Sequence, residues 1–289
     1  MRKIVHISDV HFGLARHTRI KPLIEAINRA EPDLTIVSGD LVQWGLPREF
    51  KQARWFLEQL PKPMVVVPGN HDVPMSNLLL RLFSPMSRYQ RYISKDLAPF
   101  YLDEEIAVLG INTAHGLTIR NGKLTREHMR IVEERLCPLP NDMVKIVVMH
   151  HPIDQTMEYD DTSLVKYARK SMDTLAKCGA DLFLSGHMHV GYVGSTSKRY
   201  TISGYAALVV QAGTAISSRE RDGEPNSFNV LYVEHPHVQV DRYWWDVDAQ
   251  HYTLYVSEAF GHSNDGWRET SRTMKEPEIK RDNQILTQP

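Results

Sequence analysis

The sequence predicts an α/β fold, arranged as a four-layer α/β/β/α sandwich of two mixed β-sheets flanked by helices. Short apolar runs of strand length recur along the chain, and several are near-continuous in Val, Ile and Leu, which is typical of strands buried on both faces. Segments with helical character separate the early runs, and this alternation favours an α/β architecture. The later runs lie closer together, which indicates an antiparallel portion near the C-terminus.

The elements follow from these runs and from the residues that punctuate them. The predicted strands cover residues 3–8, 34–38, 64–67, 106–112, 145–149, 181–185, 207–213, 228–233 and 238–245, and the predicted helices cover 19–30, 47–60, 125–136 and 161–179. The first helix stops before Pro32, and the second has Pro47 near its first turn and Pro61 after its end. Thr125 is a candidate N-cap, and Gly179 is a natural C-cap.

The composition is that of an ordinary soluble globular protein, because 42% of the 289 residues are hydrophobic and 24% are charged. The net charge of −1 gives no strong nucleic-acid signal. No apolar stretch approaches the ~18–20 residues that span a bilayer, and the N-terminus matches a first strand better than a signal peptide. With only Cys137 and Cys178, a disulfide framework is not expected, and the reducing cytoplasm is the predicted location.

The chain is predicted to be organised as one domain over residues 1–256, with a helix-rich insertion over residues 76–103. The insertion carries Arg81, Arg88 and Arg91. It is either an amphipathic helix with a solvated basic face or a lid that brings a cation to an anionic substrate. From Ser257 the chain turns polar, and residues 257–289 are predicted to be a C-terminal tail, partly ordered by Phe260 and Trp267.

Polar side chains follow five of the apolar runs, directly after each predicted strand. In chain order they are Asp9 with His11, Asp40, Asn70 with His71 and Asp72, His150 with His151, and His187 with His189. The carboxyl ends of the strands are the edge of an α/β sheet where ligands bind, so we expect these side chains to gather there. Asp9 and His11 are two residues apart, so on an extended segment both point to one side. The pair His187 and His189 repeats this spacing.

This mixture of imidazoles and carboxylates indicates a metal site. It suits a transition metal such as Mn, Fe, Zn, Co or Ni, and it is too rich in nitrogen for Ca²⁺ or a site for Mg²⁺ alone. Two aspartates, one asparagine and four histidines make seven candidate ligands, which exceed what one such ion takes. They suit two ions that share a bridging carboxylate, roughly 3.5–4 Å apart.

The motifs "DVH", "GD", "GNHD", "HHP" and "GHMH", in this order and each after an apolar strand, resemble those of the calcineurin-like metallophosphoesterase superfamily. Their order and spacing cover roughly residues 4–190, most of the chain. The resemblance is nearest to class III cyclic-nucleotide phosphodiesterases and related bacterial phosphodiesterases, to which the later stretch "VVQAGTA…GEPNSFNVLYV" is also similar. It implies that residues 1–256 form a metallophosphoesterase domain.

The resemblance also implies a role for each motif residue. One metal ion would be held by Asp9, His11 and His189, the other by Asn70, His150 and His187, and Asp40 would bridge them. His151 would stay outside the ligand set, because the family reads His-x-Pro at this motif. Asn70, His71 and His189 would contact the substrate. His71 would bind the phosphate or protonate the leaving oxygen, and Asp72 would orient His71.

The function implied is hydrolysis of a small phosphodiester, such as a cyclic nucleotide, another nucleotide-like compound or a glycerophosphodiester. The nucleophile would be a hydroxide that bridges two metal ions. These ions would be Mn, Fe, Zn or Co, either divalent or of mixed valence. A phosphomonoesterase on the same site is the alternative. A purple acid phosphatase is disfavoured because no tyrosine follows Gly39-Asp40. The near-neutral charge argues against a DNA nuclease, and the full ligand set argues against a scaffold without activity. Aromatic residues near the C-terminus are compatible with a homodimer.

Some residues outside the motifs leave two interpretations open. Arg219, in the segment "SSRERDGEPN", either approaches the substrate phosphate or lies in a solvated loop. Arg16 and His17 follow the first motif and have the same two alternatives. His115 either reaches the pocket or belongs to a loop.

Overall fold

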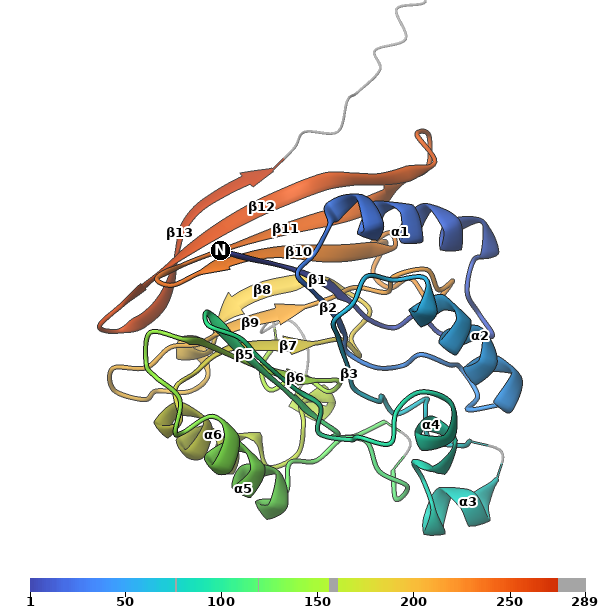
Figure 1. Cartoon of the computed structure of the whole chain (residues 1–289), viewed down its shortest axis with the longest axis horizontal. Helices are drawn as coiled ribbons and strands as arrows, with labels where there is room; N and C mark the ends of the chain where they lie inside the picture. Colours follow the sequence, from blue (N-terminus) through green and yellow to red (C-terminus); the bar gives the residue numbers. More distant parts are fainter. Residues whose placement is uncertain (76, 119, 156–160, 275–289) are drawn as a thin grey trace, which may run out of the picture.

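Two mixed β-sheets face each other in the computed structural model, which describes residues 1–75, 77–118, 120–155 and 161–274 (Figure 1). The first sheet has the order β13-β12-β11-β10-β1-β2-β3 and the second β4-β5-β6-β7-β9-β8. The first comprises β1 (Arg2–Ile7), β2 (Leu34–Val37), β3 (Met64–Val66), β10 (Ser227–Glu234), β11 (His237–Asp246), β12 (His251–Ser263) and β13 (Gly266–Met274). The second comprises β4 (Phe100–Leu102), β5 (Ile106–Ile111), β6 (Val144–Met149), β7 (Ala180–Ser185), β8 (Tyr192–Ser195) and β9 (Leu208–Gln211).

Helices cover the outer faces of both sheets, so the predicted four-layer sandwich is confirmed (Figure 1). The helices are α1 (His17–Ala30), α2 (Pro47–Glu58), α3 (Leu78–Phe83), α4 (Ser87–Tyr92), α5 (Arg126–Arg135) and α6 (Ala168–Lys177). Thr125 caps α5 as expected, because its side chain accepts a hydrogen bond from the backbone N–H of His128 at 3.2 Å. The predicted helix over 161–179 starts only at Ala168. Among the described residues, no helix is long and apolar enough to cross a bilayer.

Three apolar cores hold the four layers together, one between the sheets and one under each pair of outer helices. Strand β6 shows how one apolar run serves two of them. Ile146 and Val148 point into the core between the sheets, whereas Val147 and Met149 pack under α5 and α6. All six residues of β6 are buried, and five of them are apolar; the sixth, Lys145, donates from its ammonium to the carbonyls of Leu139 and Cys178.

The predicted insertion over residues 76–103 contains α3, α4 and the edge strand β4, and residue 76 lies outside the described residues. Two of its arginines donate hydrogen bonds to backbone carbonyls. The Arg81 guanidinium donates to the carbonyls of Pro74 and Thr118, and Arg88 donates to the carbonyl of Gly45 at 2.6 Å. The structure therefore does not support a lid that delivers one of these cations to a substrate.

The polar segment that begins at Ser257 differs from the predicted tail. Residues up to Met274 lie in the long strands β12 and β13, and residues 275–289 lie outside the described part. The alternation of β12 is hidden in the sequence because Glu258 is one of its inward residues, buried 3.8 Å from Arg242. In β13, Trp267 is buried and its indole N–H donates to Asp181 at 2.8 Å. Paired charges and one anchoring tryptophan thus order a segment of polar composition.

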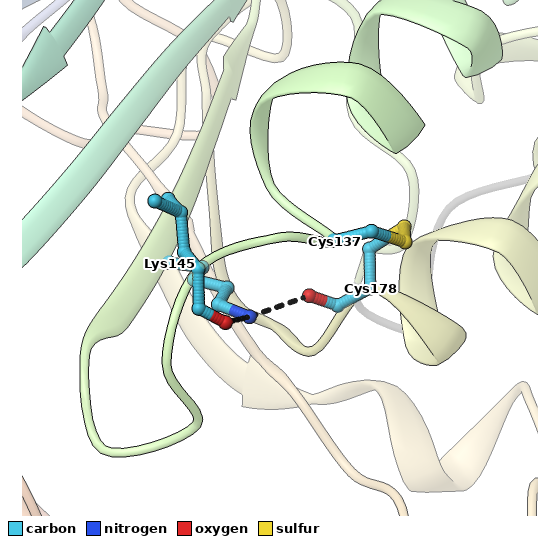
Figure 2. The surroundings of a disulfide bond; sticks show 4 residues. Cys137, Lys145 and Cys178 are labelled. Carbon is cyan, nitrogen blue, oxygen red and sulfur yellow. Dashed lines mark hydrogen bonds between the residues drawn. A yellow bond between two sulfur atoms is a disulfide. The ribbon is translucent and has the colours of Figure 1, made fainter.

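Cys137 and Cys178 form a disulfide, contrary to the expectation from the sequence (Figure 2). Cys137 follows α5, and Cys178 is the C-cap of α6. Both helices connect parallel neighbours of the second sheet, so their C-terminal ends come to the same edge. The sequence separation of 41 residues gives no hint of this proximity. The Lys145 ammonium donates to the Cys178 carbonyl at 3.0 Å and fixes the end of α6 from below.

Candidate metal centre

The predicted site residues follow the carboxyl ends of β1, β2, β3, β6 and β7, as the strand pattern indicated. Five of them have left-handed backbone conformations, with φ between 49° and 73°: Asp9, His11, Asp40, His187 and His189. Such values are uncommon for residues other than glycine and concentrate at functional sites. The expected strand alternation is therefore wrong in detail, because turns after the strands, and not extended backbone, aim these side chains.

One cluster contains Asp9, His11, Asp40 and His189, all buried. The carboxylate Oδ1 of Asp9 lies 3.5 Å from Nε2 of His11 and 3.2 Å from Nε2 of His189. The two imidazole Nε2 atoms are themselves 3.2 Å apart. These donors converge on one point, as a metal ligand set requires.

A second cluster lies beside the first and contains Asn70, His150 and His187. Nε2 of His150 lies 3.0 Å from Oδ1 of Asn70, and the rings of His150 and His187 have centroids 5.1 Å apart. Asp40 joins the clusters, because its Oδ2 lies 3.3 Å from Nε2 of His150 and 3.7 Å from Nε2 of His11. A carboxylate between two donor sets is the arrangement expected of a bridging ligand.

The hydrogen bonds of two histidines show that this site suits cations. His189 donates from Nδ1 to the Arg219 carbonyl at 2.7 Å, and His150 donates from Nδ1 to the Ser38 carbonyl at 2.8 Å. In each neutral ring the remaining Nε2 then carries a lone pair, which faces the carboxylate of Asp9 or Asp40. Acceptors that face acceptors in a buried site need a positive charge between them, and metal ions satisfy that need.

The electrostatics give the same result. Burial opposes charge on Asp9, yet neighbouring histidines, His189 first, hold the pKa of its carboxyl well below the usual range. Burial also opposes a charged His150, but the carboxylate of Asp40 raises the pKa of His150 to about 9. His187 lacks so close a carboxylate, so burial and the adjacent His150 lower its pKa to about 3. The centre thus attracts positive charge while leaving the His187 imidazole neutral.

Glycines allow the motif loops to approach each other closely. A Cβ on Gly69 would overlap Oδ1 and the backbone N of Asp40, and a Cβ on Gly186 would overlap the side chains of Ser8 and Asp9. The missing side chain of Gly69 makes room for Asp40.

His71 lies at the side of the centre, but Asp72 does not orient it as predicted. His71 donates from Nδ1 to the Gln43 carbonyl at 2.8 Å, and its Nε2 lies 2.8 Å from the guanidinium of Arg219. The carboxyl of Asp72 instead accepts from the backbone N–H groups of Val42 and Gly69 at 3.1 and 2.8 Å. Asp72 therefore fastens two motif loops together. Burial, with the charge of Asp40, raises the pKa of Asp72 to about 7.

His151 lies close to His150 and His187, but protein groups occupy both of its ring nitrogens. Nδ1 lies 2.8 Å from the Thr113 hydroxyl, and Nε2 donates to the Arg120 carbonyl at 2.9 Å. A ring nitrogen of His151 lies within 4.8 Å of donor atoms of His150 and His187, but its hydrogen bonds compete with metal binding, and its exclusion from the ligand set stays a prediction.

A cavity of about 290 Å³ opens above the centre. It is lined by the candidate site residues Asp40, Asn70, His71, His187 and His189, together with Arg120, Ser163, Met188, Arg219 and Arg221. Arg219 was one of the open alternatives, and the structure places it in the cavity. Gln43, Arg120 and Arg221 were not singled out, because they lie in loops with no motif spacing. His115, by contrast, is absent from this lining.

Five strand ends that bring two joined donor clusters beneath one cavity define a metal-dependent hydrolase of the α/β sandwich class. The sequence profile of the family described as "Calcineurin-like phosphoesterase" matches residues 2–191, and the chain belongs to this family. It is accordingly a phosphoric ester hydrolase.

Relatives and solved structures agree with this assignment. The chain is 25% identical over 200 residues to a "probable cyclic nucleotide phosphodiesterase" of Rhodopseudomonas palustris, covering 65% of this chain and 71% of the relative. It is 30% identical over 167 residues to a "glycerophosphodiester phosphodiesterase" of Enterobacter lignolyticus, covering 52% of this chain and 56% of the relative. The structure of a "dimetal phosphatase" from Danio rerio shares the fold, with a TM-score of 0.54 and 13% identity over 83% of this chain and 95% of that one.

Proposed function

We propose that this protein is a phosphodiesterase that uses two metal ions to hydrolyse a small phosphodiester, such as a cyclic nucleotide or another nucleotide-like compound. One observation carries the proposal: two donor clusters share Asp40 beneath a cavity that three arginines also line. The preference for diesters is inferred from the names of the two bacterial relatives, both of which are called phosphodiesterases.

The proposed ligands of one ion are Asp9, His11 and His189, those of the other are Asn70, His150 and His187, and Asp40 is shared. When bound, such ions activate water as a nucleophile and neutralise charge on the phosphoryl group. Mn, Fe, Zn and Co all suit this mixture of nitrogen and oxygen donors. The buried Oδ1 of Asp9 and Nδ1 of His11 have no hydrogen-bond partner among the described residues, and the carboxylate oxygen fits a metal ligand.

His71 and Arg219 are the proposed substrate-contacting pair. The Gln43 carbonyl holds Nδ1 of His71, which leaves Nε2 directed at Arg219 on the cavity wall. The substrate phosphoryl group would accept hydrogen bonds from Arg219, while His71 binds it or transfers a proton to the leaving oxygen. Asn70 and His189 line the same cavity and would contact the substrate beside the metal ions.

A phosphomonoesterase is the second candidate. The arginines that line the cavity favour this candidate, because a monoester carries two negative charges and a simple diester carries one. The same ligand set would serve both reactions, so the leaving group and the charge of the substrate distinguish them.

The cytoplasm is the proposed location, and a homodimer is the proposed assembly. The disulfide between Cys137 and Cys178 argues against this location, because the thiols of a cytoplasmic protein are generally kept reduced. Alkylation of thiols at lysis, followed by mass spectrometry, would measure the state of this pair in the cell. Light scattering of the purified protein would measure the oligomeric state.

The deciding experiment compares bis(p-nitrophenyl) phosphate with p-nitrophenyl phosphate, using Mn²⁺-loaded protein. We expect faster cleavage of the diester, and we expect loss of activity in Asn70→Ala. The matched control is Asn28→Ala, on α1, whose side chain bonds only backbone carbonyls. Metal content is measured in all three proteins. Cleavage of the monoester alone would replace the proposed reaction by the second candidate.

A further inference from the structure

The cationic wall of the cavity carries more positive charge than a simple diester needs. Asp40, itself a proposed metal ligand, is the one acidic residue among the described residues that line the cavity, whereas three arginines line it. Within the described part of the chain, the Arg120 side chain has no hydrogen bond or ion pair, and the partners of Arg219 are the neutral groups of Gln43 and His71. Bound metal ions would add positive charge to this space.

Two histidines hold these arginines at the cavity. His189 donates to the carbonyl of Arg219 at 2.7 Å, and His151 donates to the carbonyl of Arg120 at 2.9 Å. His151 is buried, and its other ring nitrogen is bonded to Thr113, so the backbone of Arg120 is fixed beside the centre. The fold therefore fixes the backbone from which both arginine side chains extend beside the cavity.

The space continues beyond Arg120. A second cavity of about 440 Å³ shares Arg120, Ser163 and His187 with the first, and it is also lined by Thr118, Asn121 and Thr162. The residues that line it have polar or charged side chains, which can bind a hydrophilic arm of a substrate. Arg120 lies where the two cavities meet, on the path from the metal centre to this arm.

We propose that the natural substrate is a nucleotide-like phosphodiester with a second phosphate group, which Arg120 binds while Arg219 binds the phosphate that is cleaved. This inference rests on the proposed phosphodiesterase activity. A guanidinium presents paired donors to phosphate oxygens, and a charge-assisted pair of this kind gives both affinity and position. Arg120 then selects the substrate, whereas the metal centre and Arg219 act on every diester.

Two nucleotides that differ only in one phosphate test the proposal. They are thymidine 5′-(p-nitrophenyl phosphate) and the same compound with a 3′-phosphate, and the measurement is the ratio of their kcat/KM values on Mn²⁺-loaded protein. We expect a preference of about tenfold for the phosphorylated compound, the size of one charge-assisted contact at a partly exposed site. In Arg120→Ala the ratio should fall close to one. Arg268→Ala, which removes an exposed arginine on β13, is the control that keeps the preference.

Binding of the products gives a readout without catalysis. Calorimetry compares thymidine 3′,5′-bisphosphate with thymidine 5′-monophosphate, and the same loss of preference is expected in Arg120→Ala. A wild-type ratio near one in both measurements, or a preference that persists in Arg120→Ala, would overturn the proposal. If no diester is cleaved but the bisphosphate is still preferred through Arg120, the second phosphate site stands and the phosphodiesterase proposal fails.

Discussion

Replacing Trp267 tests whether the C-terminal segment is part of the sandwich. Trp267 lies in β13, is buried in the core between the sheets, and donates to Asp181 on β7 at 2.8 Å. Truncation of a buried tryptophan typically costs about 3–5 kcal/mol, which is a large part of the stability of an ordinary domain. We therefore expect Trp267→Ala to lower the free energy of unfolding by about this amount. Trp267→Phe keeps most of the apolar contact and should lose about 1–3 kcal/mol with the N–H donor.

Urea denaturation followed by circular dichroism measures these differences. Trp55→Ala is the matched control, because Trp55 on α2 is 51% exposed and should change the unfolding free energy by less than about 1 kcal/mol. A loss below about 1 kcal/mol in Trp267→Ala would refute the reasoning. It would mean that β13 is not docked in solution and that a tail from Ser257 describes the chain better.

Three further outcomes are expected. Mn²⁺ should stabilise the metal-free protein by about 2.7 kcal/mol when free Mn²⁺ is a hundredfold above its Kd. Thermal melts should show that Asp40→Asn loses most of this gain. An equal gain in the variant would exclude Asp40 as a ligand. Burial raises the pKa of Asp181, so the folded state keeps this proton at a pH where the unfolded chain has lost it. Stability should therefore fall as pH rises from the ordinary Asp pKa to the raised folded pKa and then level off, and Asp181→Asn should flatten this part of a denaturation series unless another group causes it. Reducing the disulfide should cost about 4 kcal/mol for a separation of 41 residues, and an unchanged urea midpoint with reductant would show that the bond does not stabilise the fold.

The sequence was most informative where burial on both faces leaves an unbroken apolar run. Strand β6 and its neighbours were predicted for this reason, and the polar residues that end those strands gather at one edge of the sandwich. Each motif could be found locally, because candidate metal donors directly follow the end of an apolar strand. The assignment of His187 and His189 to separate clusters came from the family resemblance and agrees with the distances.

What the sequence did not predict depends on partners that are distant in the chain. Strand β12 was missed because Glu258 occupies a core position, which ion pairs with Arg242 on β11 and Arg272 on β13 make acceptable. The family resemblance assigned Asp72 to His71, yet its partners are the backbone N–H groups of Val42 and Gly69. In both cases the sequence gives the chemistry of the side chain, but the fold determines its partner.

The doublet of His150 and His151 shows how one motif serves two purposes. The two rings have centroids 5.0 Å apart and are nearly perpendicular, and they turn to different neighbours. His150 faces Asp40 and Asn70 at the centre, whereas His151 bonds Thr113 and the backbone of Arg120 at the cavity wall. A substitution of His151 should therefore displace Arg120 at the cavity wall more than it displaces the proposed metal ligands. The same strand end that supplies a proposed ligand to a metal ion also places the residue proposed to choose the substrate.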